Sequence, residues 1–144
     1  MQPSCEFTDD ATGEHYDAIL KPLRAYNDSV IGNPRAQAFA WSLRDADSAV
    51  VTGGLYGRLG ASWMFIELLV VPEACRGQGV GRELMARAEA LARDRGCSGI
   101  WLDTFSFQAP DFYRRLGFEV FGELADYPPG HTRYFLRKLL ERSA

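Results

Sequence analysis

A glycine-rich segment is the part of the chain best suited to bind a phosphate. Residues 76–81 read Arg-Gly-Gln-Gly-Val-Gly and lie between an apolar run, Trp63–Val71, and a strongly periodic helical pattern, Val80–Ala92. Alternate glycines let successive N–H groups surround an oxyanion, and the positive end of a helix dipole lies behind them. Arg76 adds a fixed positive charge. Glycines can also serve only a tight turn, but three of them beside an arginine favour phosphate binding.

The spacing of these glycines excludes two common nucleotide-binding motifs. A P-loop requires G-x-x-x-x-G-K-[ST], and no Lys-Ser or Lys-Thr follows residue 81. A dinucleotide-binding fingerprint requires G-x-G-x-x-G early in a βαβ unit, whereas the glycines here alternate as G-x-G-x-G after two strands of antiparallel character.

Glu67 is a candidate general base because it interrupts the apolar run Trp63–Val71. A carboxylate in such a run must be paired, hydrated or protonated, since uncompensated burial is costly. Deprotonating an amine of pKa ~10.4 at neutral pH costs on the order of 4–5 kcal/mol without a base. The alternative is that Glu67 pairs with an arginine or faces solvent at a strand edge. Cys75 is rejected as a nucleophile because no histidine is adjacent in sequence to activate it.

Length and composition predict one soluble domain spanning residues 1–144. Hydrophobic residues make up 47% of the chain, and the net charge of −3 argues against nucleic acid or an anionic membrane as partner. No apolar run reaches the ~18–20 residues of a membrane helix, and the N-terminus has no secretory signal, so we expect a cytoplasmic protein. Three scattered cysteines and two histidines predict neither a disulfide framework nor a metal site.

The pattern of hydrophobic residues and turns predicts an α/β sandwich, with a mixed, mostly antiparallel sheet flanked by helices. We expect a helix near 16–26, kinked or split at Pro22, a long helix from Val80 and a short helix over 109–116. A turn is expected at 57–60, and the strand that follows it should be central and buried on both faces. The expected strands are 5–8, 39–43, 49–56, 63–71, 99–105, 118–123 and 131–139.

Two segments resemble the signatures of the GNAT superfamily of acyl-CoA dependent N-acyltransferases. Residues 76–81 match its [RQ]-x-x-G-x-[GA] pyrophosphate loop, and residues 109–118, Ala-Pro-Asp-Phe-Tyr-Arg-Arg-Leu-Gly-Phe, resemble its second signature. The similarity extends over about residues 49–140. One position departs from the family, because Ser106 stands where many members have Asn seven residues before the tyrosine.

The resemblance implies a GNAT-like fold and a single N-acetyltransferase domain without a metal. The expected reaction transfers an acetyl group from acetyl-CoA directly to a primary amine of a small molecule, peptide or protein in a ternary complex. The alternative is a catalytically silent acyl-CoA binding or sensing module, and a nucleotide-dependent oxidoreductase is a weaker third possibility. We expect a homodimer, because strands 118–123 and 131–139 should be exposed at the end of the sheet.

The resemblance also implies roles for individual residues. Tyr113 corresponds to the family's general acid for the departing thiolate, although its spacing alone also fits a core tyrosine that packs beside Phe112 and Leu116. Asp103, Tyr127 and His131 are candidates to face the acceptor, although each could equally be structural. The residues implied in cofactor binding are Leu69, Val70, Val71, Arg76, Gly77, Gln78, Gly79, Val80, Gly81, Arg82, Ser106 and Ala109.

Overall fold

The computed structural model describes residues 2–32 and 36–141, and the chain divides into two compact units, Met1–Arg35 and Ala36–Ala144. In its described residues the first unit contains a single helix, α1 (Gly13–Ile31), which has no buried residue. The main-chain N–H of Thr12 donates a hydrogen bond to Nδ1 of His15 at 3.0 Å, which satisfies a donor where the helix begins.

Two expectations for this first unit are wrong. Residues 5–8 form no strand within the first unit, because a strand requires a partner and no described segment of this unit pairs with them. The helix is also not split at Pro22. Proline removes one helical hydrogen bond, but at an exposed position water can satisfy the carbonyl that is left free.

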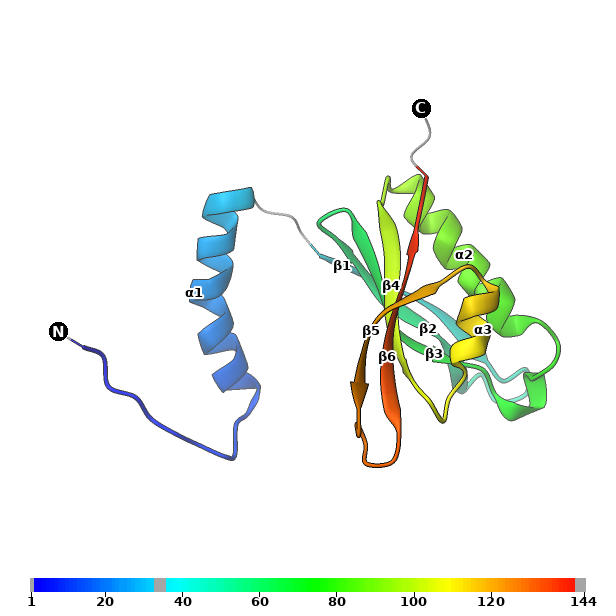
Figure 1. Ribbon diagram of the computed structural model, residues 1–144, viewed down its shortest axis with the longest axis horizontal. Helices are drawn as coiled ribbons and strands as arrows, with labels where there is room; N and C mark the ends of the chain where they lie inside the picture. The colour runs from blue at the N-terminus through cyan, green and yellow to red at the C-terminus, as the bar shows by residue number, and fades with distance from the viewer. Residues whose placement is uncertain (1, 33–35, 142–144) are drawn as a thin grey trace. The chain divides into compact units, whose positions relative to one another are not determined.

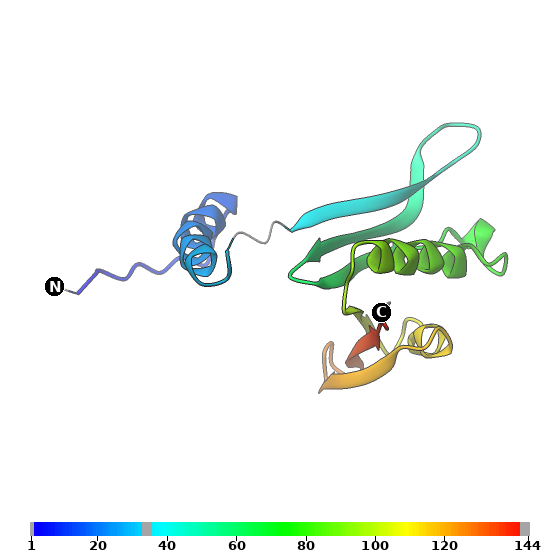
Figure 2. The same ribbon diagram turned by 90° about the horizontal axis from the view of Figure 1, so that it is seen from above.

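The second unit is built on a six-stranded sheet in the order β1-β2-β3-β4-β6-β5 (Figures 1 and 2). Neighbouring strands are antiparallel except β3 and β4, which run parallel. This confirms the predicted mixed, mostly antiparallel sheet. The strands are β1 (Gln37–Arg44), β2 (Val51–Gly60), β3 (Trp63–Val70), β4 (Gly99–Phe105), β5 (Glu119–Ala125) and β6 (Thr132–Leu139).

Between residues 36 and 141, two helices and a short 3-10 turn, η1 (Glu73–Cys75), accompany the sheet. α2 (Val80–Asp94) packs its buried residues into the hydrophobic core, and α3 (Pro110–Arg115) packs its aromatic residues against the same core. Gly96, just after the C-terminal end of α2, has a positive φ of +70°, which lets the chain turn out of the helix. The core residues of α2 are Leu84, Met85, Ala88 and Ala92, and those of the central strands are Met64, Ile66, Ile100, Leu102 and Leu136.

The expected turn at 57–60 lies instead inside β2, and the chain reverses at Ala61 and Ser62, whose φ values are +51° and +68°. A Cβ atom at Gly57 would approach the ring of Phe39 and the carbonyl oxygen of Phe65 to 2.6 Å. The glycine therefore serves close packing within the sheet rather than a turn.

Two further expectations about the sheet need correction. β3 is central, but it is buried only up to Ile66, and most residues that follow are exposed. β6 pairs with β4 on one side and with β5 on the other, so only β5 of the two predicted end strands lies at the edge. Hydrophobic pattern alone does not distinguish an inner strand from an edge strand.

The core should depend strongly on β6. Leu136→Ala should lower the free energy of unfolding by about 2–5 kcal/mol, because the side chain is 0% exposed and its loss leaves a cavity. Leu139→Ala on the same strand is the control, and its effect should stay within about 0.5 kcal/mol because that side chain is 58% exposed. Urea denaturation followed by circular dichroism measures both, and equal losses would contradict this assignment of the core.

Candidate active site

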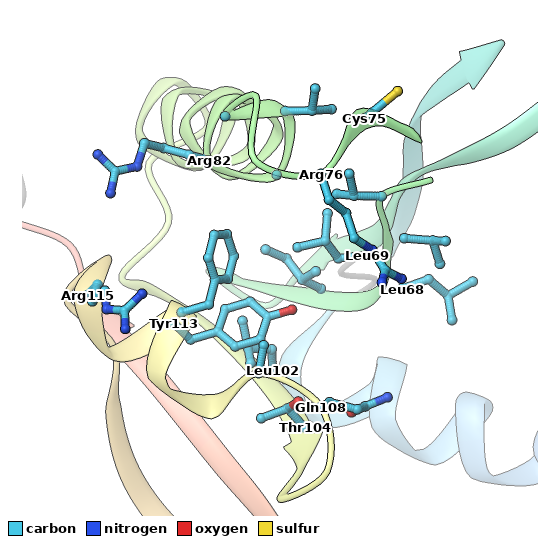
Figure 3. A pocket seen from close by; sticks show the side chains of 18 of the residues that line it. Leu68, Leu69, Cys75, Arg76, Arg82, Leu102, Thr104, Gln108, Tyr113 and Arg115 are labelled. Carbon is cyan, nitrogen blue, oxygen red and sulfur yellow. Dashed lines mark hydrogen bonds between the residues drawn. The ribbon is translucent and has the colours of Figure 1, made fainter. Parts of the chain in front are cut away.

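The site is created where the two parallel strands separate. β3 and β4 pair through Ile66 and Leu102 and no further, although each strand continues. β3 goes on pairing with β2 as far as Val70, and β4 with β6 as far as Phe105, so the edges that face each other beyond this point have no partner strand. A cavity of about 1010 Å³ opens there, bounded also by α3 and by the loop before α2 (Figure 3).

A β-bulge places Glu67 at the start of this separation. Leu68 lies opposite Tyr56 and Ile66 opposite Gly57, so Glu67 is the extra residue in the β2–β3 ladder. Such a bulge redirects a side chain and increases the local twist of the strand. Glu67 lines the cavity.

Glu67 is exposed, although the strand that carries it was expected to be buried on both faces. Its side chain is 44% exposed, and its Oε2 lies 3.7 Å from Nε of Arg58 on β2. The arginine pairing that the sequence left open is therefore present. An ion pair this exposed contributes little to stability, and the carboxylate stays accessible from the cavity.

The three glycines before and at the start of α2 have different physical roles. Gly77 and Gly79 have φ values of +79° and +78°, and a Cβ atom at either would meet nothing within 4 Å. They are therefore required for the path of the backbone. At Gly81 a Cβ atom would lie 3.3 Å from Cγ2 of Val71 and 3.4 Å from the ring of Phe112, so this glycine permits close packing of α2.

The start of α2 can donate hydrogen bonds to a ligand. The first N–H groups of a helix have no acceptor inside the helix, and Gly79 at the N-cap has no side chain to accept from them. Gly77, Gly79, Val80 and Gly81 line the cavity, so these donors border the open space. Gln78 is not among the lining residues, and its side chain donates to the carbonyl oxygen of Ala74 at 3.3 Å.

Tyr113 reaches the cavity from α3, and its hydroxyl points into the open space (Figure 3). Its ring packs edge-on against Phe112 and Phe118, with centroid distances of 5.1 and 6.1 Å. Burial, and then the negative charge of Asp103, raise the pKa of Tyr113 to about 12. The phenol is therefore a neutral hydrogen-bond donor throughout the physiological pH range.

Asp103 lines the cavity but already has a strong partner. One carboxylate oxygen accepts from Nη2 and Nε of Arg133 at 2.9 and 3.0 Å. The guanidinium also lies 5.2 Å from the ring centroid of Tyr127 and 5.5 Å from that of Phe105. The hydrogen bond to Asp103 raises the pKa of Arg133. This arrangement has the character of a structural ion pair beside the cavity.

The remaining predicted residues divide into two groups. Leu69, Val70, Val71, Arg76, Arg82 and Ala109 all line the cavity. Ser106, Tyr127 and His131 do not; the Ser106 hydroxyl accepts from the main-chain N–H of Thr132 at 3.0 Å and lies 3.4 Å from Nδ1 of His131. The structure thus brings most of the predicted cofactor-binding residues together around the cavity. It leaves Gln78 and Ser106 outside, together with two of the three predicted acceptor residues, Tyr127 and His131.

Several lining residues were missed by sequence reasoning. Oε1 of Gln108 accepts hydrogen bonds from the buried Thr104 hydroxyl and from the main-chain N–H of Phe105, both at 2.9 Å. Alternation along the strand 99–105 could have placed Leu102 and Thr104 on one face, but no local pattern marks Gln108. The other missed residues are Ile66, Leu68, Cys75, Phe107, Phe112 and Arg115.

Within residues 2–32 and 36–141, no three His, Cys, Asp or Glu side chains are grouped so as to hold a metal ion. None of the helices described in this part of the chain is long and apolar enough to cross a membrane.

Comparison with known proteins gives consistent matches. The sequence profile of the acetyltransferase (GNAT) family matches residues 5–118. The acetyltransferase Atu2258 of Agrobacterium fabrum is 40% identical over 131 residues, which are 91% of this chain and 95% of that protein. Blasticidin-S acetyltransferase of Streptomyces morookaense is 45% identical over 91 residues, covering 62% of this chain and 67% of that protein.

A solved structure agrees with the fold. The crystal structure of an acetyltransferase from Bacillus cereus has a TM-score of 0.81 and 29% sequence identity, and the match covers 94% of this chain and 98% of that one. Since the family profile covers most of the chain and a relative of 40% identity is matched over nearly its full length, this chain belongs to the GNAT family of acetyltransferases.

Proposed function

We propose that the chain transfers the acetyl group of acetyl-CoA directly to a primary amine, with both substrates bound at once. One observation carries this proposal: the unpaired edge of β3 and the glycine loop at the start of α2 border the same cavity. Acetyl-CoA has an arm that contains two amides and, farther from the thioester, a diphosphate. Its binding therefore requires that the free strand edge and the glycine loop border one cavity.

The arm of CoA fits the free edge of β3. Its two amides can form hydrogen bonds with the backbone of Leu69, Val70 and Val71, as an added strand would. The diphosphate then meets the N–H groups around Gly77 and Gly79 at the start of α2. A main-chain N–H of β3 near the thioester would polarise the acetyl carbonyl.

Glu67 is the proposed base. Its carboxylate is exposed to the cavity at the point where β3 leaves β4, so an amine that approaches the thioester there can transfer its proton to Glu67 directly or through one water. The bulge supports this role because it places the carboxylate beside the free strand edge.

Tyr113 is proposed to stabilise the departing thiolate by a hydrogen bond. Complete proton transfer from a phenol of pKa about 12 to a thiolate of pKa ~8.5 is uphill by about 5 kcal/mol. A charge-assisted hydrogen bond from the neutral phenol avoids that cost and still stabilises the leaving group.

The acceptor is proposed to be a primary amine of a small molecule or of a peptide or protein. The likeness to blasticidin-S acetyltransferase supports a small-molecule amine as the first class to test. Asp103, Tyr127 and His131 remain candidates to contact the acceptor, although only Asp103 lines the cavity.

Location and assembly are further parts of the proposal. Free Cys5, Cys75 and Cys97 fit a reducing compartment such as the cytoplasm. β5 is an edge strand with Phe121 and Leu124 each 50% exposed, which supports pairing with a second copy in a homodimer.

The function is tested by combining a binding and a turnover measurement. Calorimetry should detect binding of CoA, and a screen of primary amines with acetyl-CoA should release free thiol, measured by a chromogenic disulfide. Replacing Gly79 by Val should weaken CoA binding at least about tenfold, because a β-branched residue resists the positive φ that the loop requires. Binding without turnover on any amine would support a silent acyl-CoA binding module instead, and no CoA binding would refute both.

Glu67→Gln should lower kcat by about 10²–10⁴-fold at neutral pH, because the amine then loses its proton acceptor. The difference in kcat between Glu67→Gln and the wild type should become smaller as the pH rises toward the amine's own pKa of ~10.4, because more of the amine is then unprotonated. Glu119→Gln is the matched control: Glu119 also pairs with an arginine across strands, at 3.0 Å, but does not line the cavity. An unchanged pH–rate profile in Glu67→Gln would rule out this role.

Tyr113→Phe should lower kcat by about 10-fold or more while changing the Kd for CoA by less than about threefold, since the ring packing remains and only the hydroxyl is lost. Tyr134→Phe is the control, because that ring packs against the core outside the cavity. Because burial holds the pKa of Tyr113 near 12, the wild-type rate should show no loss from phenol ionisation below about pH 11. If Tyr113→Phe and Tyr134→Phe had the same kcat, the Tyr113 hydroxyl would have no role in the reaction.

A further inference from the structure

Three arginines without an acidic partner line the cavity. In the part of the chain that the structure describes, the side chains of Arg76, Arg82 and Arg115 form no ion pair and no hydrogen bond. The neighbouring arginines on the same helices differ: Arg87 pairs with a glutamate on α2, and Arg114 pairs with an aspartate on α3. The cavity therefore concentrates positive charge in a chain whose net charge is −3.

These three arginines do not lie together. The Arg76 side chain extends toward Leu68 and Leu69 on β3 (Figure 3). Arg82, from α2, and Arg115, from α3, lie on the opposite side of the cavity, where the two helices border the same open space. Both side chains therefore border the same side of the open space.

The way acetyl-CoA lies in the cavity determines which of its anionic groups reaches Arg82 and Arg115. The inference rests on the proposed function, in which the thioester lies beside Tyr113 and β3 and the diphosphate lies on the loop of Gly77 and Gly79. The nucleotide end of the carrier must then continue past the start of α2, away from β3 and toward Arg82 and Arg115.

We propose that Arg82 and Arg115 bind the 3′-phosphate of CoA and make the enzyme selective for CoA over donors that lack this group. A phosphomonoester carries about −1.5 to −2 charges at pH 7, and the planar guanidinium fork matches its oxygens. Two arginines without competing carboxylates balance this charge. Arg115 thus helps to determine the specificity of the site that binds CoA.

The test compares two ligands that differ only by the 3′-phosphate. Calorimetry on the full chain should give a Kd for CoA at least about tenfold lower than for dephospho-CoA. In Arg115→Gln the Kd for CoA should rise about tenfold, while the Kd for dephospho-CoA changes less than about twofold. Arg115→Lys should retain part of the discrimination because it keeps the charge but loses the fork.

Arg114→Gln is the matched control, since Arg114 precedes Arg115 on α3, is bound to Asp111 at 2.9 Å and does not line the cavity. In Arg114→Gln the ratio of the Kd for dephospho-CoA to the Kd for CoA should equal that of the wild type.

Equal affinity of the wild type for CoA and dephospho-CoA would overturn the 3′-phosphate site but would not contradict acetyl-CoA as the acetyl donor. Equal weakening of both ligands in Arg115→Gln would assign Arg115 to another part of the carrier and would also overturn it. Failure of the wild type to bind either ligand would refute the proposed function itself.

Discussion

The separation of β3 from β4 is the constraint on which the rest of the site depends. Parallel pairing ends at Ile66 and Leu102, so two lengths of strand keep their outer partners while their facing edges stay unpaired. Unpaired main-chain groups at a strand edge require a partner from solvent or from a ligand. The opening therefore provides both the space for a ligand and the backbone groups that can bind it.

Around that opening, charge is distributed by the neighbouring elements. β4 brings Asp103, but β6 supplies Arg133, which neutralises it at 2.9 Å. α2 and α3 bring Arg82 and Arg115 without carboxylate partners in the described parts of the chain. The cavity is positive on the helix side although the chain as a whole is acidic. Arg82 and Arg115 have no acidic partner among the described residues, whereas the lining carboxylates of Glu67 and Asp103 are each paired with an arginine.

Local sequence signals predicted the elements that carry the site, because these elements depend on nearby residues. Alternate glycines mark the loop before α2, and the helical period of α2 identifies that helix without help from its neighbours. The same signals failed where partners were distant. Gly57 looked like a turn residue because nothing in its own segment shows that Phe39 and Phe65 pack against it. The strand predicted at residues 5–8 failed because the described part of the first unit offers it no partner strand.

By itself, the sequence determined the glycine loop, the helix behind it and the presence of Glu67 and Tyr113, since these are properties of contiguous residues. Only the tertiary structure decided which partners the side chains contact and which of them face the cavity. The bulge at Glu67 and its pairing with Arg58 follow from the β2–β3 register, and the orientation of Arg115 toward the cavity follows from the docking of α3. Register and docking are set by contacts between residues far apart in the chain, which no local pattern records.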